Sequence, residues 1–219
     1  MNITPELCMD KLAARFGAGE AHRFSNAVRS RVNMWKTRLN RLMEPVLTYR
    51  IVDIPYRTKS MLELERGVRL KSVKLARALR DSRKAVCFLV TIGPGIEEEI
   101  NRLMEDKRLS EAYILDALGS VAVEDMAEQF QRRMESRHFE KGLVSTLRFS
   151  PGYCDWPVTE QRPLFRVLDS RKAGVELLDS CLMHPRKTVS GVFGLSSREA
   201  PPYNPCLECS RTHCEARRS

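Results

Sequence analysis

The chain has 219 residues, of which 42% are hydrophobic and 30% are charged, and its formal net charge is +9. A chain of this length and composition buries most of its unfolded-state surface, which excludes intrinsic disorder and predicts a globular protein. It has no run of about 18 apolar residues that could cross a bilayer, and residues 1–15 lack the basic-then-apolar order of a secretion signal, so we expect a cytoplasmic protein without membrane contact.

Basic residues are spread along the chain from Arg15 to Arg218, and this indicates a solvated surface rather than a nucleic-acid groove. In residues 20–44, apolar side chains recur every three or four positions and predict one stripe on a helix that ends at Pro45. The basic side chains on its other faces could dock on an acidic partner, but a solvated face is the preferred interpretation. Residues 49–54 and 61–65 alternate and predict short strands, and residues 71–81 predict a helix.

Residues 85–92 form a continuous apolar run, which predicts a strand buried on both faces. The turn Gly93-Pro94-Gly95 ends this strand. Helices are predicted at residues 96–107, 109–135 and 159–168, and strands at 143–149, 177–183 and 188–195. Because helices and strands do not alternate regularly, the fold class is α+β. We divide the chain into an amino-terminal helical extension (1–48), an α+β domain (49–197) and a Cys-rich carboxy-terminal tail (198–219).

A candidate ligand site lies at the strand-to-turn junction Arg148-x-x-x-Gly152-Tyr153. An arginine offers a planar, bidentate donor for a carboxylate or phosphate. The Pro151-Gly152 pair predicts a tight turn in which the backbone can approach a ligand closely, and Tyr153 supplies a ring face and a hydroxyl. Taken alone, the same pattern is explained by an ordinary hairpin turn.

Five collinear stretches give this turn a context, and they lie at residues 88–95, 115–130, 161–168, 180–185 and 188–191. Together with the turn they resemble the activation domain of cobalamin-dependent methionine synthase, over about residues 85–195. In that family, Arg-x-x-x-Gly-Tyr is the signature of the S-adenosylmethionine site. The resemblance implies a mixed or antiparallel sheet with packed helices.

By position, the resemblance implies that Arg148 grips the carboxylate of S-adenosylmethionine while Gly152 and Tyr153 shape the pocket. Glu128 would balance the amino or sulfonium charge of the ligand, and its alternative is a solvated helix residue. Residues 1–84 do not align with the family. Family enzymes carry an acidic ligand-binding residue nearer the amino end, and we identify no counterpart of it in this chain.

The resemblance also implies a component of a methyltransferase system rather than a complete enzyme. The expected role is reactivation of a corrinoid protein, in which an oxidised cobalt is reduced by one electron and remethylated from S-adenosylmethionine held by this domain. Cobalamin would come from a partner, a corrinoid-binding methionine synthase or methyltransferase subunit. A flavodoxin or ferredoxin is the expected electron donor.

The tail carries a second chemical pattern, Cys206-x-x-Cys209 followed by Cys214. Three closely spaced thiolates in a reducing compartment favour a metal centre, either a [4Fe-4S] cluster or zinc, over disulfides. Cys154, Cys181 and His213 are all candidates for the fourth ligand, and an unliganded tail is the alternative. The alternative function is an iron–sulfur or structural docking module of a corrinoid protein that does not bind S-adenosylmethionine.

Overall fold

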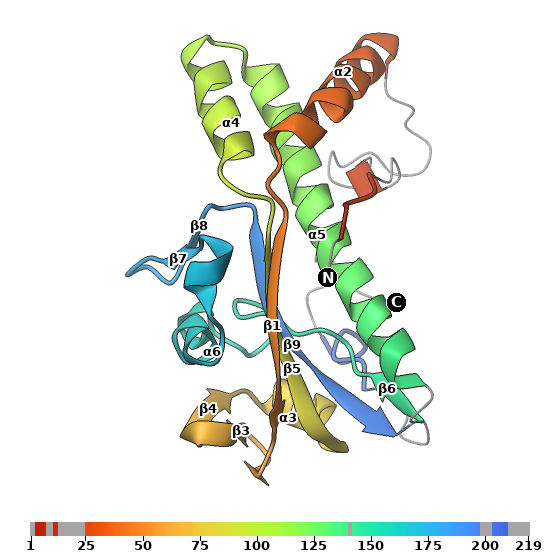
Figure 1. Ribbon diagram of the computed structural model, residues 1–219, viewed down its shortest axis with the longest axis vertical. Coiled ribbons are helices and arrows are strands. Elements are labelled where there is room, and N and C mark those ends of the chain that lie inside the picture. Colours follow the sequence, from red (N-terminus) through yellow and green to blue (C-terminus); the bar gives the residue numbers. More distant parts are fainter. Residues whose placement is uncertain (1–2, 8–10, 13–24, 140–141, 198–202, 210–219) are drawn as a thin grey trace. The chain divides into compact units, whose positions relative to one another are not determined.

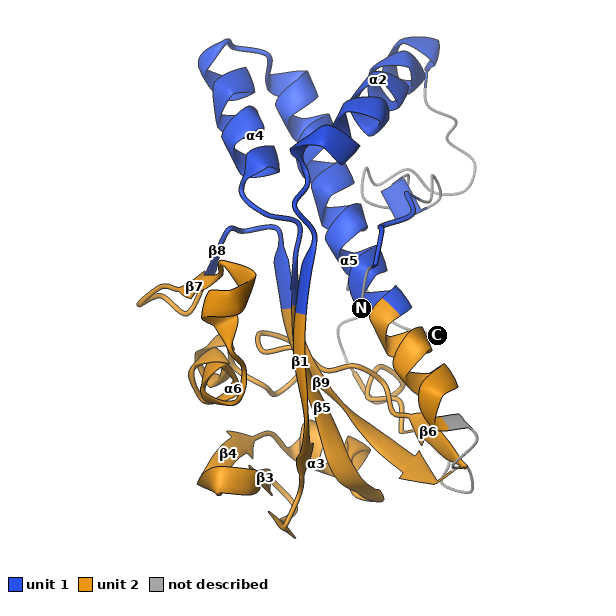
Figure 2. Cartoon of the chain, viewed as in Figure 1, with its two compact units in different colours: residues 1–47, 90–129, 183–189 blue, residues 48–89, 130–182, 190–219 orange. Residues whose placement is uncertain are grey.

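A computed structural model describes residues 3–7, 11–12, 25–139, 142–197 and 203–209. The chain forms two compact units, which Figure 2 distinguishes by colour. Unit 1 comprises residues 1–47, 90–129 and 183–189, and unit 2 comprises residues 48–89, 130–182 and 190–219. Within the described residues, no helix is both long and apolar enough to span a membrane.

The main sheet has four strands in the order β1-β5-β9-β6 (Figure 1). Its bounds are β1 Val46–Asp53, β5 Ser82–Thr91, β9 Thr188–Ser197 and β6 Leu143–Ser145. β6 pairs antiparallel with β9, with Leu143 opposite Ser197. Every residue of β5 from Ala85 onwards is buried, which confirms the predicted strand with two covered faces.

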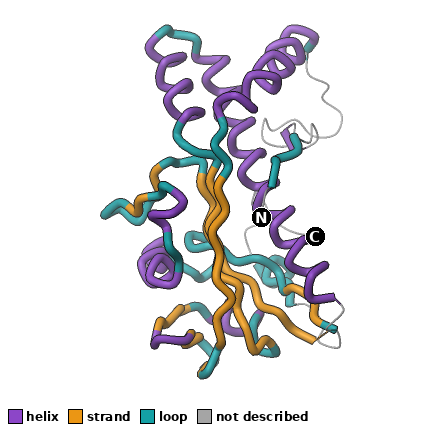
Figure 3. The backbone as a smooth tube through the Cα atoms, viewed as in Figure 1, coloured by secondary structure: helices purple, strands orange, loops and turns teal. Residues whose placement is uncertain are grey.

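Unit 1 is mostly helical, as the purple segments of Figure 3 show. It contains α2 (Asn26–Leu42), α4 (Gly95–Glu105) and the first part of α5 (Leu109–Phe139), which continues into unit 2. The side chain of Ser25 caps α2 by accepting from Val28 N at 3.4 Å. Trp35 is 1% exposed, and its indole N–H donates to Glu111 on α5 at 3.0 Å.

In unit 1, the turn Gly93-Pro94-Gly95 lies in close contact with the end of α2. A Cβ atom on Gly95 would lie 2.5 Å from the carbonyl oxygen of Leu42, a separation that real side chains do not show. Next to it, Glu44 N donates to Ile92 O at 2.9 Å. The end of α2 therefore lies in close contact with the turn that follows β5, and only glycine permits this contact at residue 95.

Unit 2 holds a three-stranded antiparallel sheet of β2 (Tyr56–Arg57), β3 (Met61–Leu64) and β4 (Val68–Lys71), with Leu62 opposite Leu70. Its helices are α3 (Val73–Ala78) and α6 (Gln161–Val167). Four rings form its aromatic core, with centroids 5.1–6.0 Å apart between successive neighbours, and they belong to Tyr49, Phe88, Phe130 and Phe193.

The mixture of helices and antiparallel strands confirms the α+β fold class, but the strand predicted at residues 177–183 is wrong and the one predicted at 143–149 already ends at Ser145. Instead of one strand, this region forms the short strands β7 (Glu176–Leu177) and β8 (Met183–His184), which pair with each other. A turn separates them, closed by Leu178 N donating to Leu182 O at 2.9 Å. Cys181 has a φ of 64° in that turn, so the backbone reverses where the apolar pattern suggested continuity.

Candidate functional site

The predicted ligand turn is anchored to the main sheet at its first residues. Phe149 lies beside Val192 of β9, and their backbone N–H and C=O groups bond in both directions at 2.9 and 2.8 Å. The adjacent Gly191 makes this approach possible, because a Cβ atom there would lie 2.6 Å from Phe149 O and 2.9 Å from the ring of Phe88. Arg148, directly before the anchor, is half-buried.

The turn then folds back over a buried tryptophan. Gly152 has a φ of +96°, in the region that favours glycine, and its N–H donates to Trp156 O at 2.7 Å. Trp156 N donates in turn to Tyr153 O at 3.0 Å. Trp156 is 1% exposed whereas Tyr153 is 49% exposed, so the backbone of a buried residue closes a turn that carries a half-exposed tyrosine.

Asp155 ties the far end of the turn to α3. Its carboxylate accepts from Ser72 Oγ and Val73 N, both at 2.7 Å, and from Lys74 N at 3.2 Å. These are donors at the start of α3, which a carboxylate stabilises both by hydrogen bonding and by the helix dipole. Sequence reasoning missed Asp155, because the donors that it caps lie more than 80 positions earlier in the chain.

The structure places Arg148, Gly152 and Tyr153 on one anchored segment of unit 2. Glu128 lies on α5 in unit 1, where its carboxylate forms an ion pair with Lys11 Nζ. Glu128 and the turn belong to different units, and the role of Glu128 toward a ligand stays a prediction. Sequence reasoning also missed the pairing with Lys11, which comes from a segment that has no counterpart in the resemblance.

A second polar network in unit 1 holds residues 183–189 against α4 and α5. Glu97 of α4 accepts from Arg186 N at 2.9 Å and from Arg186 Nε at 2.7 Å, and His184 Nδ1 lies 3.9 Å away. Lys187 Nζ donates to Asp116 at 2.7 Å and to Ser120 at 2.8 Å. Burial alone would raise the pKa of Glu97, but the hydrogen bonds from Arg186, with the charges of Arg186 and His184, outweigh burial and hold that pKa below its usual 4.5.

Replacement of Glu97 by Gln is expected to lower the free energy of unfolding at pH 7 by about 1 kcal/mol, because it removes a charge-assisted pair whose arginine is well exposed. A group with a lowered folded-state pKa stabilises above its unfolded pKa, and this stabilisation is lost as the pH falls through the folded value. The difference between the wild type and Glu97→Gln should therefore be constant near neutrality and shrink below pH 4.5. Urea unfolding from pH 7 to pH 3 measures this difference, and a gap that persists at pH 3 would contradict the assignment.

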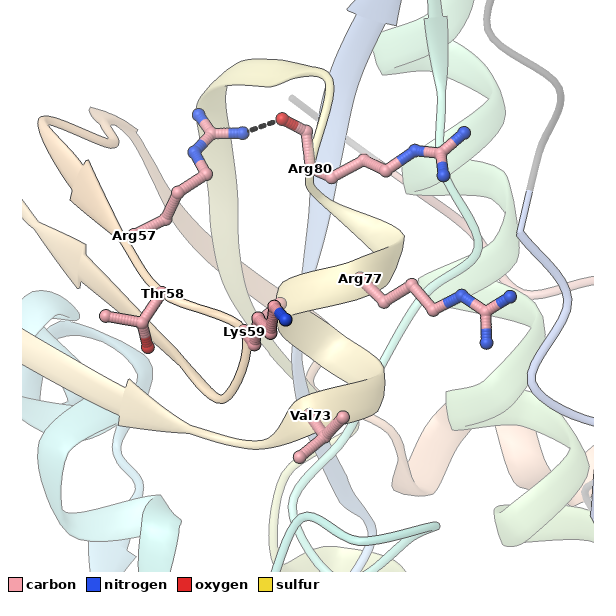
Figure 4. Close-up of a pocket in the computed structure, with 7 residues that line it drawn as sticks. Arg57, Thr58, Lys59, Val73, Arg77 and Arg80 are labelled. Carbon is pink, nitrogen blue, oxygen red and sulfur yellow. Dashed lines mark hydrogen bonds between the residues drawn. The ribbon is translucent and has the colours of Figure 1, made fainter.

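A hollow of about 380 Å³ lies elsewhere in unit 2, lined by Arg57, Thr58, Lys59, Val73, Ala76, Arg77 and Arg80 (Figure 4). Arg57 is committed to the fold, because it donates to the carbonyl oxygens of Leu79 at 2.9 Å and of Ser82 at 2.5 Å. Figure 4 shows its guanidinium also directed at the carbonyl of Arg80. None of the predicted ligand residues lines this hollow.

The described part of the tail, residues 203–209, is attached to α3 through Arg77. The Arg77 guanidinium lies 4.3 Å from the ring centroid of Tyr203, and its Nη1 pairs with Glu208 at 2.9 Å. Tyr203 also donates its hydroxyl to Glu208 at 3.1 Å. The cation–π contact and the ion pair hold the segment that contains Cys206 on unit 2, and the Tyr203–Glu208 bond closes this segment on itself.

The predicted metal centre is not supported by the residues that the structure describes. Among them, no three His, Cys, Asp or Glu side chains are placed to hold a metal ion, and Cys214 and His213 lie outside the described ranges. Burial raises the pKa of Cys154, Lys74 opposes this, and the nearby thiols of Cys206 and Cys209 raise it further.

Comparison with known families decides the identity of the fold. A family model described as vitamin B12-dependent methionine synthase, activation domain, matches residues 76–215. The chain belongs to this family. The match begins earlier than the resemblance at residue 85 and reaches into the cysteine tail, so part of the tail is included in the methionine synthase activation domain.

A solved structure, the MetH reactivation domain bound to AdoHcy, is similar to this activation domain with a TM-score of 0.63 and 16% sequence identity. The similarity covers 81% of this chain and 66% of the solved chain, so this protein spans just under two thirds of that structure. At this identity the likeness shows the fold, and it confirms the predicted activation-domain architecture. No curated protein matches the chain.

Proposed function

We propose that this chain is a reactivation module that binds S-adenosylmethionine and presents it to a corrinoid held by a partner protein. The observation that carries the proposal is the Arg148–Tyr153 turn, which is anchored to β9 at Phe149 and to α3 by Asp155. In the family resemblance this turn is the signature of the ligand site, and in this chain it would fix the ligand's orientation. Membership of the activation-domain family supports the corrinoid partner, either a methionine synthase or a related methyltransferase subunit.

Each residue of the turn would have a different role in binding the methyl donor. Arg148 would bind the ligand carboxylate through two parallel N–H donors, and Gly152 would leave room for the backbone to approach. The half-exposed ring of Tyr153 would cover one side of the ligand. The corrinoid supplies the methyl acceptor when a partner brings it, while this chain contributes orientation, which is itself a large catalytic effect.

Titration calorimetry with S-adenosylmethionine and S-adenosylhomocysteine tests the binding role directly. We expect measurable heat and a rise in the melting temperature with either ligand, because both carry the amino acid carboxylate that Arg148 would bind. A ligand that binds only the native state stabilises it in proportion to its concentration, so thermal shift gives an independent readout. The absence of heat and of any shift at millimolar ligand would overturn the proposal.

A second candidate function is thiolate ligation of a metal or iron–sulfur cluster by the tail, and one observation favours it. Arg77 holds the Cys206-x-x-Cys209 segment on unit 2, so this pair would offer two thiolates to a thiophilic centre that Cys214 would complete. Such a centre would let the module relay an electron from a flavodoxin or ferredoxin. It could serve a docking role even without S-adenosylmethionine binding.

Metal analysis of protein purified without oxygen checks this second candidate. We expect about one zinc ion, or one cluster of iron and sulfide, per chain. The metal content should fall strongly in the Cys206→Ser and Cys154→Ser variants. Cys181→Ala is the matched control, since that thiol is buried in another turn with its sulfur 4.0 Å from Asp179 O. Equal metal content in all four proteins, or none in the wild type, would contradict thiolate ligation.

A further inference from the structure

The hollow in unit 2 lies between one face of α3 and the turn that joins β2 to β3. Four lining residues on the α3 side are three or four positions apart and therefore share one helical face, and they are Val73, Ala76, Arg77 and Arg80. Ala76 is 4% exposed whereas Val73 is 54% exposed. Figure 4 shows the guanidinium groups of Arg77 and Arg80 extended in the same direction, away from Arg57, so these two residues line the hollow with their methylene stems. The wall that α3 contributes is therefore apolar.

The opposite wall carries two cations, Arg57 and Lys59. Nη1 of Arg57 donates to the carbonyl oxygens of Leu79 and Arg80, and its Nη2 donates to that of Ser82 at 2.5 Å. These bonds fix the guanidinium but use only three of its five N–H donors. Within the described part of the chain, no carboxylate pairs with either cation. The Nε–H and the second Nη2–H of Arg57 therefore remain as a fork that fits a carboxylate.

The size and the exposure of the hollow determine which class of occupant it fits. Its volume of about 380 Å³ is at the lower end of the range for small-molecule sites, which bury about 70–90% of their ligand. Here Val73 is more than half exposed, and Thr58 and Lys59 are exposed as well, so a small molecule would stay largely in solvent. An exposed apolar wall beside cations without acidic partners is instead typical of a surface that binds another protein.

We propose that this hollow is a docking site for an acidic segment of a partner protein. A carboxylate of the segment binds Arg57 and Lys59, and a neighbouring apolar side chain packs against Val73 and Ala76. A nucleic acid or an anionic membrane surface would use the two cations but leave the apolar wall uncovered, which favours a protein segment. The site goes beyond the proposed function, because no residue of the Arg148–Tyr153 turn lines the hollow and four of its seven lining residues precede position 76, where the family match begins.

The test is an NMR titration of the isotopically labelled full chain with a synthetic peptide in which one leucine is flanked on each side by a pair of glutamates. We expect the amide resonances of residues 57–59 and 73–80 to shift and to saturate at millimolar peptide. Lys59→Glu should weaken binding by about five- to tenfold, because it replaces an attraction with a repulsion. Val73→Ala should weaken it by about two- to threefold through lost apolar contact. Both positions are exposed, so both variants should fold, and Arg171→Glu is the matched control at an exposed position of unit 2 that does not line the hollow.

Two altered peptides separate the charge from the apolar contact. Glutamine in place of the glutamates should abolish binding, and alanine in place of the leucine should weaken it by about two- to threefold. The inference is overturned by the absence of saturable shifts, by equal binding of the glutamine peptide, or by equal losses in Lys59→Glu and Arg171→Glu. A random DNA duplex or phosphatidylserine vesicles that shift the same resonances more strongly than the peptide would assign the hollow to phosphate and overturn it as well. Titration of S-adenosylmethionine should be unaffected by Lys59→Glu, so failure of this inference leaves the proposed function standing.

Discussion

Replacement of Arg148 by Ala is expected to weaken S-adenosylmethionine binding by roughly 10- to 150-fold. Hydrogen bonds to a charged partner contribute about 1.5–3 kcal/mol, and a guanidinium that binds a carboxylate through two parallel donors belongs at the upper part of that range. The turn itself should survive, because Phe149, Asp155 and the backbone bonds of Trp156 anchor it. Titration calorimetry at low ionic strength gives the change in affinity.

Two variants make this result specific. Arg166→Ala removes an exposed arginine from α6 in the same unit and should leave affinity unchanged. Arg148→Lys keeps the charge but loses the planar fork, so it should recover only part of the affinity. If Arg148→Ala still supports corrinoid reactivation while Cys206→Ser abolishes it, the thiol tail performs the function and the S-adenosylmethionine site does not.

Replacement of Gly191 by Ala is expected to lower the free energy of unfolding by about 3 kcal/mol. The added Cβ would lie 2.6 Å from Phe149 O and 2.9 Å from the buried Phe88 ring, and neither neighbour is the free end of a flexible side chain. Overpacking of this kind costs about 1–3 kcal/mol, and clashes with backbone belong at the top of the range. For a chain of this size, the melting temperature should fall by about 6–12 °C.

Gly174→Ala is the matched control for crowding. Gly174 has a φ of +65°, but a Cβ atom there would meet no atom within 4 Å, so its cost of about 1–2 kcal/mol comes from the left-handed backbone alone. Because Gly191 positions the first residues of the signature turn, Gly191→Ala should also weaken ligand binding whereas Gly174→Ala should not. Equal melting temperatures for the two variants would contradict the close approach at Phe149.

The local sequence pattern determined the buried strand at 85–92, the helices at 96–107 and 109–135, and the α+β class. Each of these depends on side chains that are close neighbours in the chain, so an apolar run or a helical period is sufficient to indicate it. The Arg148–Tyr153 turn was also visible, because proline and glycine constrain the backbone locally. The family resemblance drew on the same short blocks and on their order.

Tertiary structure alone decided what surrounds these elements. The cap that Asp155 places on α3, the close approach of Gly191 to Phe149 and the pairing of Lys11 with Glu128 all join residues more than 40 positions apart. Residues 177–183 became two short strands because their partners are each other, which no alternation of apolar and polar residues reveals. Sequence spacing determines which face of an element is apolar, whereas the contacts that complete a site depend on which distant segments the packed chain brings together.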